Sequence, residues 1–261
     1  MNEELRERLV QDLRKSGFYS EMHAIRCCAA AKWECHGSFT YFDKDQRATR
    51  ECDFEAVRQW FELGEDGASI QFIARLLGQV KKSETPWIVF MDRLIDPHFV
   101  DRGEDIIVTN VQEQKDLGDA LRSGMPMTRR NWMGIAIHEA FKKPTESSRW
   151  YSAFVSACKA AESAFDAVVA APRLGTFFEW IKPVVVLDGL MLSAELSPAG
   201  EIVLTETGEA SFAFEYRSDA YTRQRFFLDV VTLDSFPRYL DHVAARITAV
   251  SNLFLALRNC R

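Results

Sequence analysis

Hydrophobic and polar residues alternate in two adjoining segments in the first quarter of the chain. Segments 33–42 (WECHGSFTYF) and 50–60 (RECDFEAVRQW) have the period of two that is typical of strands, and DKDQRAT between them predicts a turn. Alternation places Glu51, Asp53 and Glu55 on one side of the second strand and Cys52, Phe54 and Ala56 on the other. Carboxylates that face a protein interior do not stabilise a strand. Asp53 is therefore a candidate for binding a ligand.

Helical periodicity and strand-like runs predict the remaining elements. In the second helix, Ser20 is the expected N-cap and Glu21 falls in the first turn. The predicted helices cover 2–17, 19–32, 111–123, 147–171 and 235–259. The further predicted strands cover 70–81, 87–92, 105–110, 182–189, 190–196, 201–206, 210–217 and 223–234. Segment 125–144, with the basic and aromatic stretch TRRNWMG, fits no regular element.

The order of these elements predicts the fold class. A helix, a run of strands and a further helix are typical of an α/β fold with a mixed sheet flanked by helices. The chain has 261 residues and is 47% hydrophobic, so it can bury one substantial core. We expect a core in 1–125 and a C-terminal α/β extension in 126–261 packed on it, or one single domain.

Charge and cysteine content narrow the classes of function. The formal net charge is -6, so phosphate contacts require a local basic patch on an acidic background. Arg122, Arg129 and Arg130, or Arg217, Arg223 and Arg225, are the candidates, although surface solvation explains each one individually. The six cysteines are Cys27, Cys28, Cys35, Cys52, Cys158 and Cys260, and their irregular spacing is not typical of a disulfide framework or a zinc site. Free thiols, a charged N-terminal stretch and the lack of a membrane-length apolar run predict a cytoplasmic protein outside the membrane.

Four residues suggest chemistry when they are considered together. Gln79 and Lys81 are two positions apart on the third predicted strand and therefore share a face. Asp53 lies on the neighbouring strand, and Glu21 lies on the preceding helix. Metal-assisted phosphodiester hydrolysis uses a carboxylate and a nearby oxygen to bind a hard divalent ion, with an ammonium group that orients the attacking water.

The order SGFYSE, KWECHGSFTYFDKDQRATRECDFEA and LLGQVKKSETPWIVF resembles the restriction-endonuclease-like (PD-(D/E)XK) nuclease superfamily over about the first 92 residues. The motif of that superfamily is an acid on the second strand and an acid-x-Lys pair on the third. Its Mrr-like branch has Gln-x-Lys at this place. The resemblance implies that Asp53 is the principal metal ligand, that Glu21 completes the pocket, and that Gln79 and Lys81 replace the third-strand acid and the catalytic lysine.

The resemblance also implies an activity. The expected protein is a Mg²⁺-dependent endonuclease of DNA, with Mn²⁺ as a substitute, and a homodimer is compatible with this class. Gln79 keeps a carbonyl oxygen but removes one negative charge, so metal binding should be weaker than at an acidic site.

Other interpretations of the same residues remain open. Asp53 and Glu51 could pair with Arg50 or Arg58 at an edge strand, and an acid at position 21 is favoured by the helix dipole alone. At the level of function, the rivals are a degenerate nuclease fold that acts as a binding or sensor module, and an interaction protein assembled through its long helices.

Overall fold

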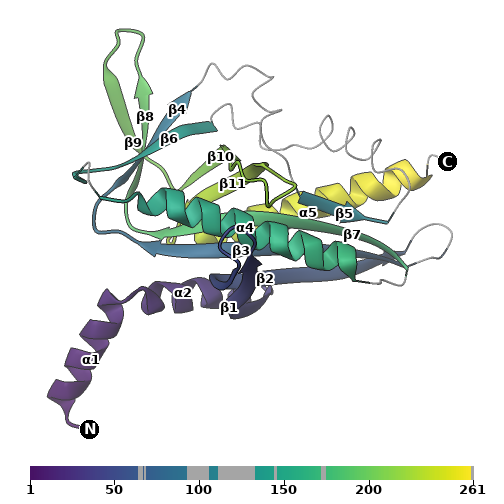
Figure 1. Cartoon of the computed structure of the whole chain (residues 1–261), viewed down its shortest axis with the longest axis horizontal. Helices are drawn as coiled ribbons and strands as arrows, with labels where there is room; N and C mark the ends of the chain where they lie inside the picture. The colour runs from purple at the N-terminus through teal and green to yellow at the C-terminus, as the bar shows by residue number, and fades with distance from the viewer. Residues whose placement is uncertain are drawn as a thin grey trace.

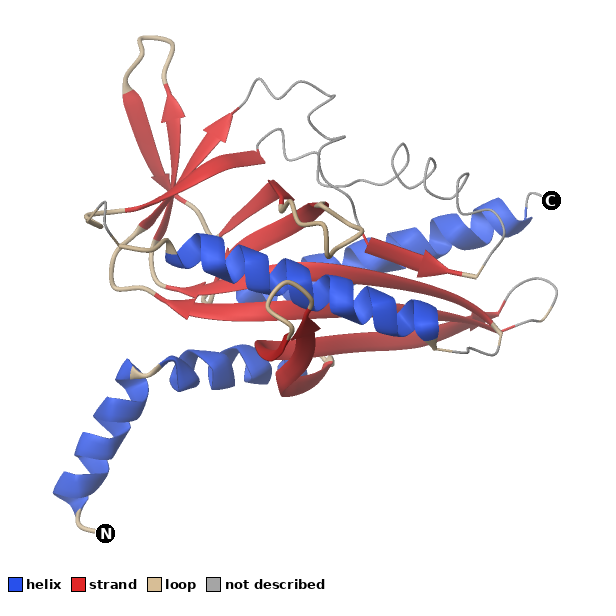
Figure 2. Cartoon of the chain, viewed as in Figure 1, coloured by secondary structure: helices blue, strands red, loops and turns tan. Residues whose placement is uncertain are grey.

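One large mixed sheet, flanked by helices, forms the body of the protein (Figures 1 and 2). The computed structural model describes residues 1–63, 67, 69–92, 106–110, 133–143, 146–171 and 175–259. The helices are α1 (Glu3–Lys15), α2 (Gly17–Ala30), α4 (Arg149–Ala170) and α5 (Phe236–Asn259). The predicted α/β class with a mixed, helix-flanked sheet is therefore confirmed.

In the described part of the chain the sheet contains eleven strands, in the order β1-β2-β3-β7-β11-β10-β6-β4-β8-β9, with β5 paired to β7. Their bounds are β1 (Glu34–Asp43), β2 (Ala48–Leu63), β3 (Ser69–Lys82), β4 (Trp87–Asp92), β5 (Ile106–Thr109), β6 (Met133–Glu139), β7 (Thr176–Asp188), β8 (Met191–Leu196), β9 (Ile202–Glu206), β10 (Glu209–Glu215) and β11 (Arg225–Thr232). Strand β2 runs antiparallel to β1 and β3. Strand β7 lies between β3 and β11 and runs parallel to both. Strands from both halves of the chain thus share one sheet.

Each face of the sheet has its own hydrophobic core. Helix α4 packs on one face, where Phe154 belongs to the same cluster as Leu77 and Val185. Helices α2 and α5 cover the opposite face, where Ala24 and Phe236 belong to a second cluster. Alternation along β3 and β7 sends successive side chains to the two cores, as expected for strands covered on both faces.

Several predicted elements differ from the observed ones. Strand β7 begins at Thr176, before the predicted start, and β6 lies in the segment that fitted no regular element. Helix α2 begins at Gly17 with Ser16 at the N-cap position, so the prediction that Ser20 caps this helix is wrong. Ser20 is buried and donates a hydrogen bond to Asp188 at the end of β7. The predicted helix 111–123 lies outside the described residues.

Among the described helices, none is long and apolar enough to cross a membrane.

Candidate active site

The candidate site lies where β2 and β3 separate. Their pairing runs from Leu63↔Ser69 to Phe54↔Gly78 and stops there. Beyond this point β2 stays paired with β1, and β3 stays paired with β7. The two strands therefore leave a gap between them that begins at Asp53.

A glycine permits this arrangement. A Cβ atom at position 78 would lie 2.0 Å from ring atoms of Phe54, so the Phe54 ring lies directly over the Gly78 backbone. Only a residue without a side chain fits there. The ring of Phe54 thus fills the end of the paired region, next to the gap.

The regular alternation of β2 breaks at the same point. Cys52 belongs to the core under α4, whereas Phe54 and Ala56 belong to the core under α2 and α5. The expectation that these three residues share one side is therefore wrong. Ser38 of β1 has a positive φ of 57° and, like Asp53 opposite it, has no partner in the β1–β2 pairing, although the register is the same on either side, at Gly37↔Phe54 and Phe39↔Cys52. The pairing of β1 with β2 is therefore interrupted opposite Asp53, at the point where the side chains of β2 change face.

Asp53 links the two separated strands. Its Oδ2 accepts a hydrogen bond from the Val80 backbone N–H at 2.6 Å and lies 3.5 Å from Lys81 Nζ. The carboxylate thereby replaces the strand partner that the Val80 N–H has lost. The Asp53 side chain is 18% exposed, so it remains open to solvent on one side. The pairing of Asp53 with Arg50 or Arg58, considered from sequence, is not what the structure shows.

Gln79 and Lys81 share the face that the sequence predicts. Lys81 Nζ donates to Gln79 Oε1 at 3.0 Å. Gln79 is only 4% exposed, and its Nε2 is buried without a hydrogen-bond partner among the described residues. The opposite amide orientation would place the Gln79 NH₂ group against an ammonium group, so the carbonyl oxygen is the atom that faces the site.

Glu21 approaches the same group of charges from α2. Its pKa is raised, first by burial and then by the negative charge of Asp53, while Lys81 acts in the opposite direction. Glu51 also raises the pKa of Glu21, which places a third carboxylate in this neighbourhood. The sequence places Glu51 on the same side of its strand as Asp53, but Glu51 was not among the predicted site residues.

These residues suit a hard divalent cation. Asp53 and Glu21 offer carboxylate oxygens, Gln79 offers an amide oxygen, and together they are the donor types that Mg²⁺ and Mn²⁺ prefer. Burial is the first cause of the raised pKa of Glu21, and the charges of Asp53 and Glu51 add to it, so a cation bound here would favour the ionised carboxylate. No cluster of three His, Cys, Asp or Glu residues with metal-binding geometry occurs in the described part of the chain, so the amide oxygen is needed to complete the donor set.

The neighbouring thiol is not a suitable ligand. Cys52 is fully buried, and burial raises the pKa of its thiol to about 12. The Cys52 thiol donates instead to the Gly78 carbonyl oxygen at 3.1 Å. It therefore supports the backbone at the point of strand separation.

The arginine residues considered for phosphate contact pair with glutamates, are exposed, or lie outside the described residues. Arg122, Arg129 and Arg130 lie outside the described residues. Arg217 pairs with Glu215, and Arg223 pairs with the buried Glu162. Arg225 is exposed at the start of β11. Lys82, which follows Lys81 in the chain, donates to the Arg14 carbonyl oxygen at the end of α1.

The chain matches no protein-family model, no curated protein and no solved structure.

Proposed function

We propose that this protein is a Mg²⁺-dependent deoxyribonuclease with a restriction-endonuclease-like core. The observation that carries the proposal is the meeting of Asp53, Gln79 and Lys81 at the separation of β2 and β3, with Glu21 in the same electrostatic neighbourhood. The order α2-β1-β2-β3, followed after β4, β5 and β6 by α4 and by β7 as the parallel neighbour of β3, is compatible with such a core.

Each residue has a defined role in the proposed reaction. Asp53, Glu21 and the Gln79 carbonyl oxygen would hold the ion, which when bound polarises a phosphate oxygen and favours a hydroxide nucleophile. Lys81 orients the attacking water and offsets the negative charge that builds on the phosphate. The hydrogen bond from Val80 N–H keeps the Asp53 carboxylate in one orientation, so that its other oxygen is free for the ion.

Cleavage of supercoiled plasmid and of single-stranded circular DNA, with Mg²⁺ or Mn²⁺ and with EDTA, tests the proposal. We expect metal-dependent cutting that disappears in Asp53→Ala and Lys81→Ala. Lys82→Ala is the matched control, because Lys82 is the adjacent lysine and binds a backbone carbonyl oxygen. Activity that survives in both site variants, or that falls equally in the control, would contradict the assignment.

A binding or sensor module without cleavage is the second candidate. Two observations favour it: Gln79 stands where an acid would strengthen metal binding, and the formal net charge of -6 disfavours DNA. Wild-type protein that binds Mn²⁺ but does not cut, together with a Gln79→Glu variant that does cut, would support this alternative.

A further inference from the structure

Helix α1 presents an apolar stripe that no other described part of the chain covers. Leu5, Leu9 and Leu13 recur every four residues and are 47%, 47% and 55% exposed. The helix has no buried residue, and it extends away from the body of the protein (Figure 1). An isolated helix of this length is marginal in water, because most helical stability comes from packing of an apolar face. The stripe therefore indicates a packing partner.

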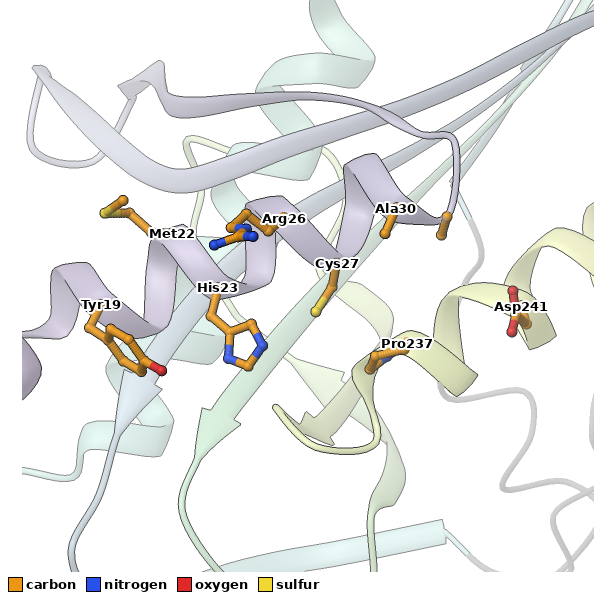
Figure 3. Close-up of a pocket in the computed structure, with 9 residues that line it drawn as sticks. Tyr19, Met22, His23, Arg26, Cys27, Ala30, Pro237 and Asp241 are labelled. Carbon is orange, nitrogen blue, oxygen red and sulfur yellow. The ribbon is translucent and has the colours of Figure 1, made fainter.

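A groove between α2 and α5 has complementary properties. Tyr19, Met22 and Ala30 of α2 and Pro237 of α5 supply apolar surface along it, and all four are exposed (Figure 3). Its two sides carry opposite charges, Arg26 on α2 and Asp241 on α5. A groove with apolar lining and charged walls is typical of surfaces that bind an amphipathic helix.

The connection between the helices prevents α1 from entering the groove of its own chain. Ser16 alone separates α1 from α2, and its backbone is extended, with φ -72° and ψ 154°. The Ser16 N–H donates to the Asp12 carbonyl oxygen, and its Oγ donates to the Leu13 carbonyl oxygen. A single residue held in this way does not allow α1 to fold back along α2. A helix in the groove must therefore come from another molecule.

The charges beside the leucine stripe match those of the groove. At 100° per residue, Asp12 lies on one side of the stripe and Arg6 lies on the other. Asp12 is thus complementary to Arg26, and Arg6 is complementary to Asp241. We propose that two copies of this chain exchange α1 helices, so that each leucine stripe packs into the α2–α5 groove of the other copy. The interface is self-complementary and closes with two-fold symmetry, and it does not depend on the proposed nuclease activity.

Sedimentation velocity of the full chain, at concentrations up to about 100 μM, tests the exchange. We expect a wild-type dimer that becomes a monomer in Leu9→Glu, since a charge replaces the centre of the stripe. Glu7→Ala, on the opposite side of α1, is the matched control and should remain dimeric. Because α1 has no buried residue, none of these changes should unfold the body, which circular dichroism checks. A monomeric wild type, or a dimer that survives Leu9→Glu, would overturn the proposal.

A charge exchange tests the occupant of the groove. Asp12→Arg and Arg26→Asp should each raise the dimer dissociation constant by about tenfold, because each places like charges together in both symmetric contacts. The double variant should restore dimerisation to nearly the wild-type level. If the double variant is no better than the singles, α1 does not lie in this groove, and the proposal fails even if the protein dimerises by another surface.

Discussion

Two of the lysines that pair with carboxylates in this protein, Lys159 and Lys81, do so in different ways. Lys159 of α4 is 5% exposed, and its Nζ lies 2.9 Å and 3.0 Å from the two oxygens of Asp43 and 2.7 Å from Asp45 Oδ2. The rings of Tyr216 and Tyr221 surround the same ammonium group, with centroids 5.1 Å and 5.5 Å away. Every charge in this cluster has close partners, so the cluster joins the β1–β2 turn to α4 and to the segment after β10.

Lys81 is held more loosely. Its side chain is 28% exposed, its nearest carboxylate oxygen is 3.5 Å away, and its closest partner is the amide oxygen of Gln79. Glu21 beside it has a raised pKa, whereas the pKa of Asp45 in the Lys159 cluster is lowered to about 2. The comparison indicates that an ion pair with close partners stabilises the fold. Charged groups whose partners are more distant are instead available for chemistry.

Removing Lys159 should have the largest effect on stability. Lys159→Met leaves Asp43 and Asp45 without their buried cation, and we expect the free energy of unfolding to fall by about 3–5 kcal/mol. Urea unfolding followed by circular dichroism measures it. A loss below about 1 kcal/mol would show that the cluster is not the stabilising member of the comparison.

Removing Lys81 should lower activity strongly and change stability little. Lys81→Met should lower the rate of DNA cleavage by about 10²–10³-fold, because it removes a group that acts in the transition state. The same change should alter the free energy of unfolding by less than about 1 kcal/mol, because the ion pair with Asp53 is partly exposed. DNA binding, measured by fluorescence anisotropy, should be largely retained. Loss of binding instead would make Lys81 a phosphate anchor only.

Gln79→Glu should strengthen the site by adding one negative charge beside the gap. We expect Mn²⁺ affinity, measured by isothermal titration calorimetry, to rise by about tenfold if the residue coordinates the ion directly. Without metal, the added charge should raise the pKa of Glu21 further. Unchanged affinity would place residue 79 outside the metal site.

Glu21→Gln should show how much burial, and after it the neighbouring carboxylates, oppose ionisation of Glu21. A raised carboxyl pKa means that ionisation of Glu21 opposes folding as pH rises above about 4.5, its ordinary value. Without metal, Glu21→Gln should therefore melt at a slightly higher temperature than wild type at pH 7, and at the same temperature below pH 4.5. Its Mn²⁺ affinity should fall. Equal melting temperatures at both pH values would contradict a raised pKa of Glu21.

Tyr216→Phe should have the smallest effect. Burial by itself would raise the pKa of Asp45, but hydrogen bonds from Lys159, Ser218 and Tyr216 lower it to about 2. Asp45 therefore stabilises the fold above its ordinary pKa of 3.8, and this stabilisation is lost as pH falls towards 2. Without the Tyr216 hydroxyl we expect a loss of about 1 kcal/mol at pH 7 and acid unfolding at a higher pH. An unchanged acid transition would exclude the Tyr216 hydrogen bond as a cause of the lowered pKa.

The sequence predicted those parts of the fold and site that depend on local periodicity. The β1–β2 hairpin and the shared face of Gln79 and Lys81 follow from a period of two. The first half of β7 was missed because Glu179 resembles a surface residue, and the predicted strand began only at Lys182, itself a charged residue. Both are buried, and Glu179 pairs with Arg75 whereas Lys182 pairs with Asp229. Such pairing is a tertiary effect that no single segment reveals.

The hydrogen bond from Val80 N–H to Asp53 could not be predicted from the sequence either. It exists because β2 and β3 separate after Phe54 and Gly78, where the Phe54 ring packs over the glycine. Ser20 was assigned to helix capping because its type favours that role, whereas the chain uses it to reach Asp188 from a helix that begins earlier. In both cases a contact distant in sequence decided the outcome.

The pairing of β3 with β7 has a consequence for the order of folding. The hairpins that carry Asp53 and Lys81 consist of strands close in sequence, but β3 is fixed on its other side by a strand from the second half of the chain. Contacts of this kind form slowly, since a long loop must close before they are gained. During synthesis, the residues of the site therefore emerge well before the strand that holds β3 in place, and a rigid site exists only once most of the chain has been made.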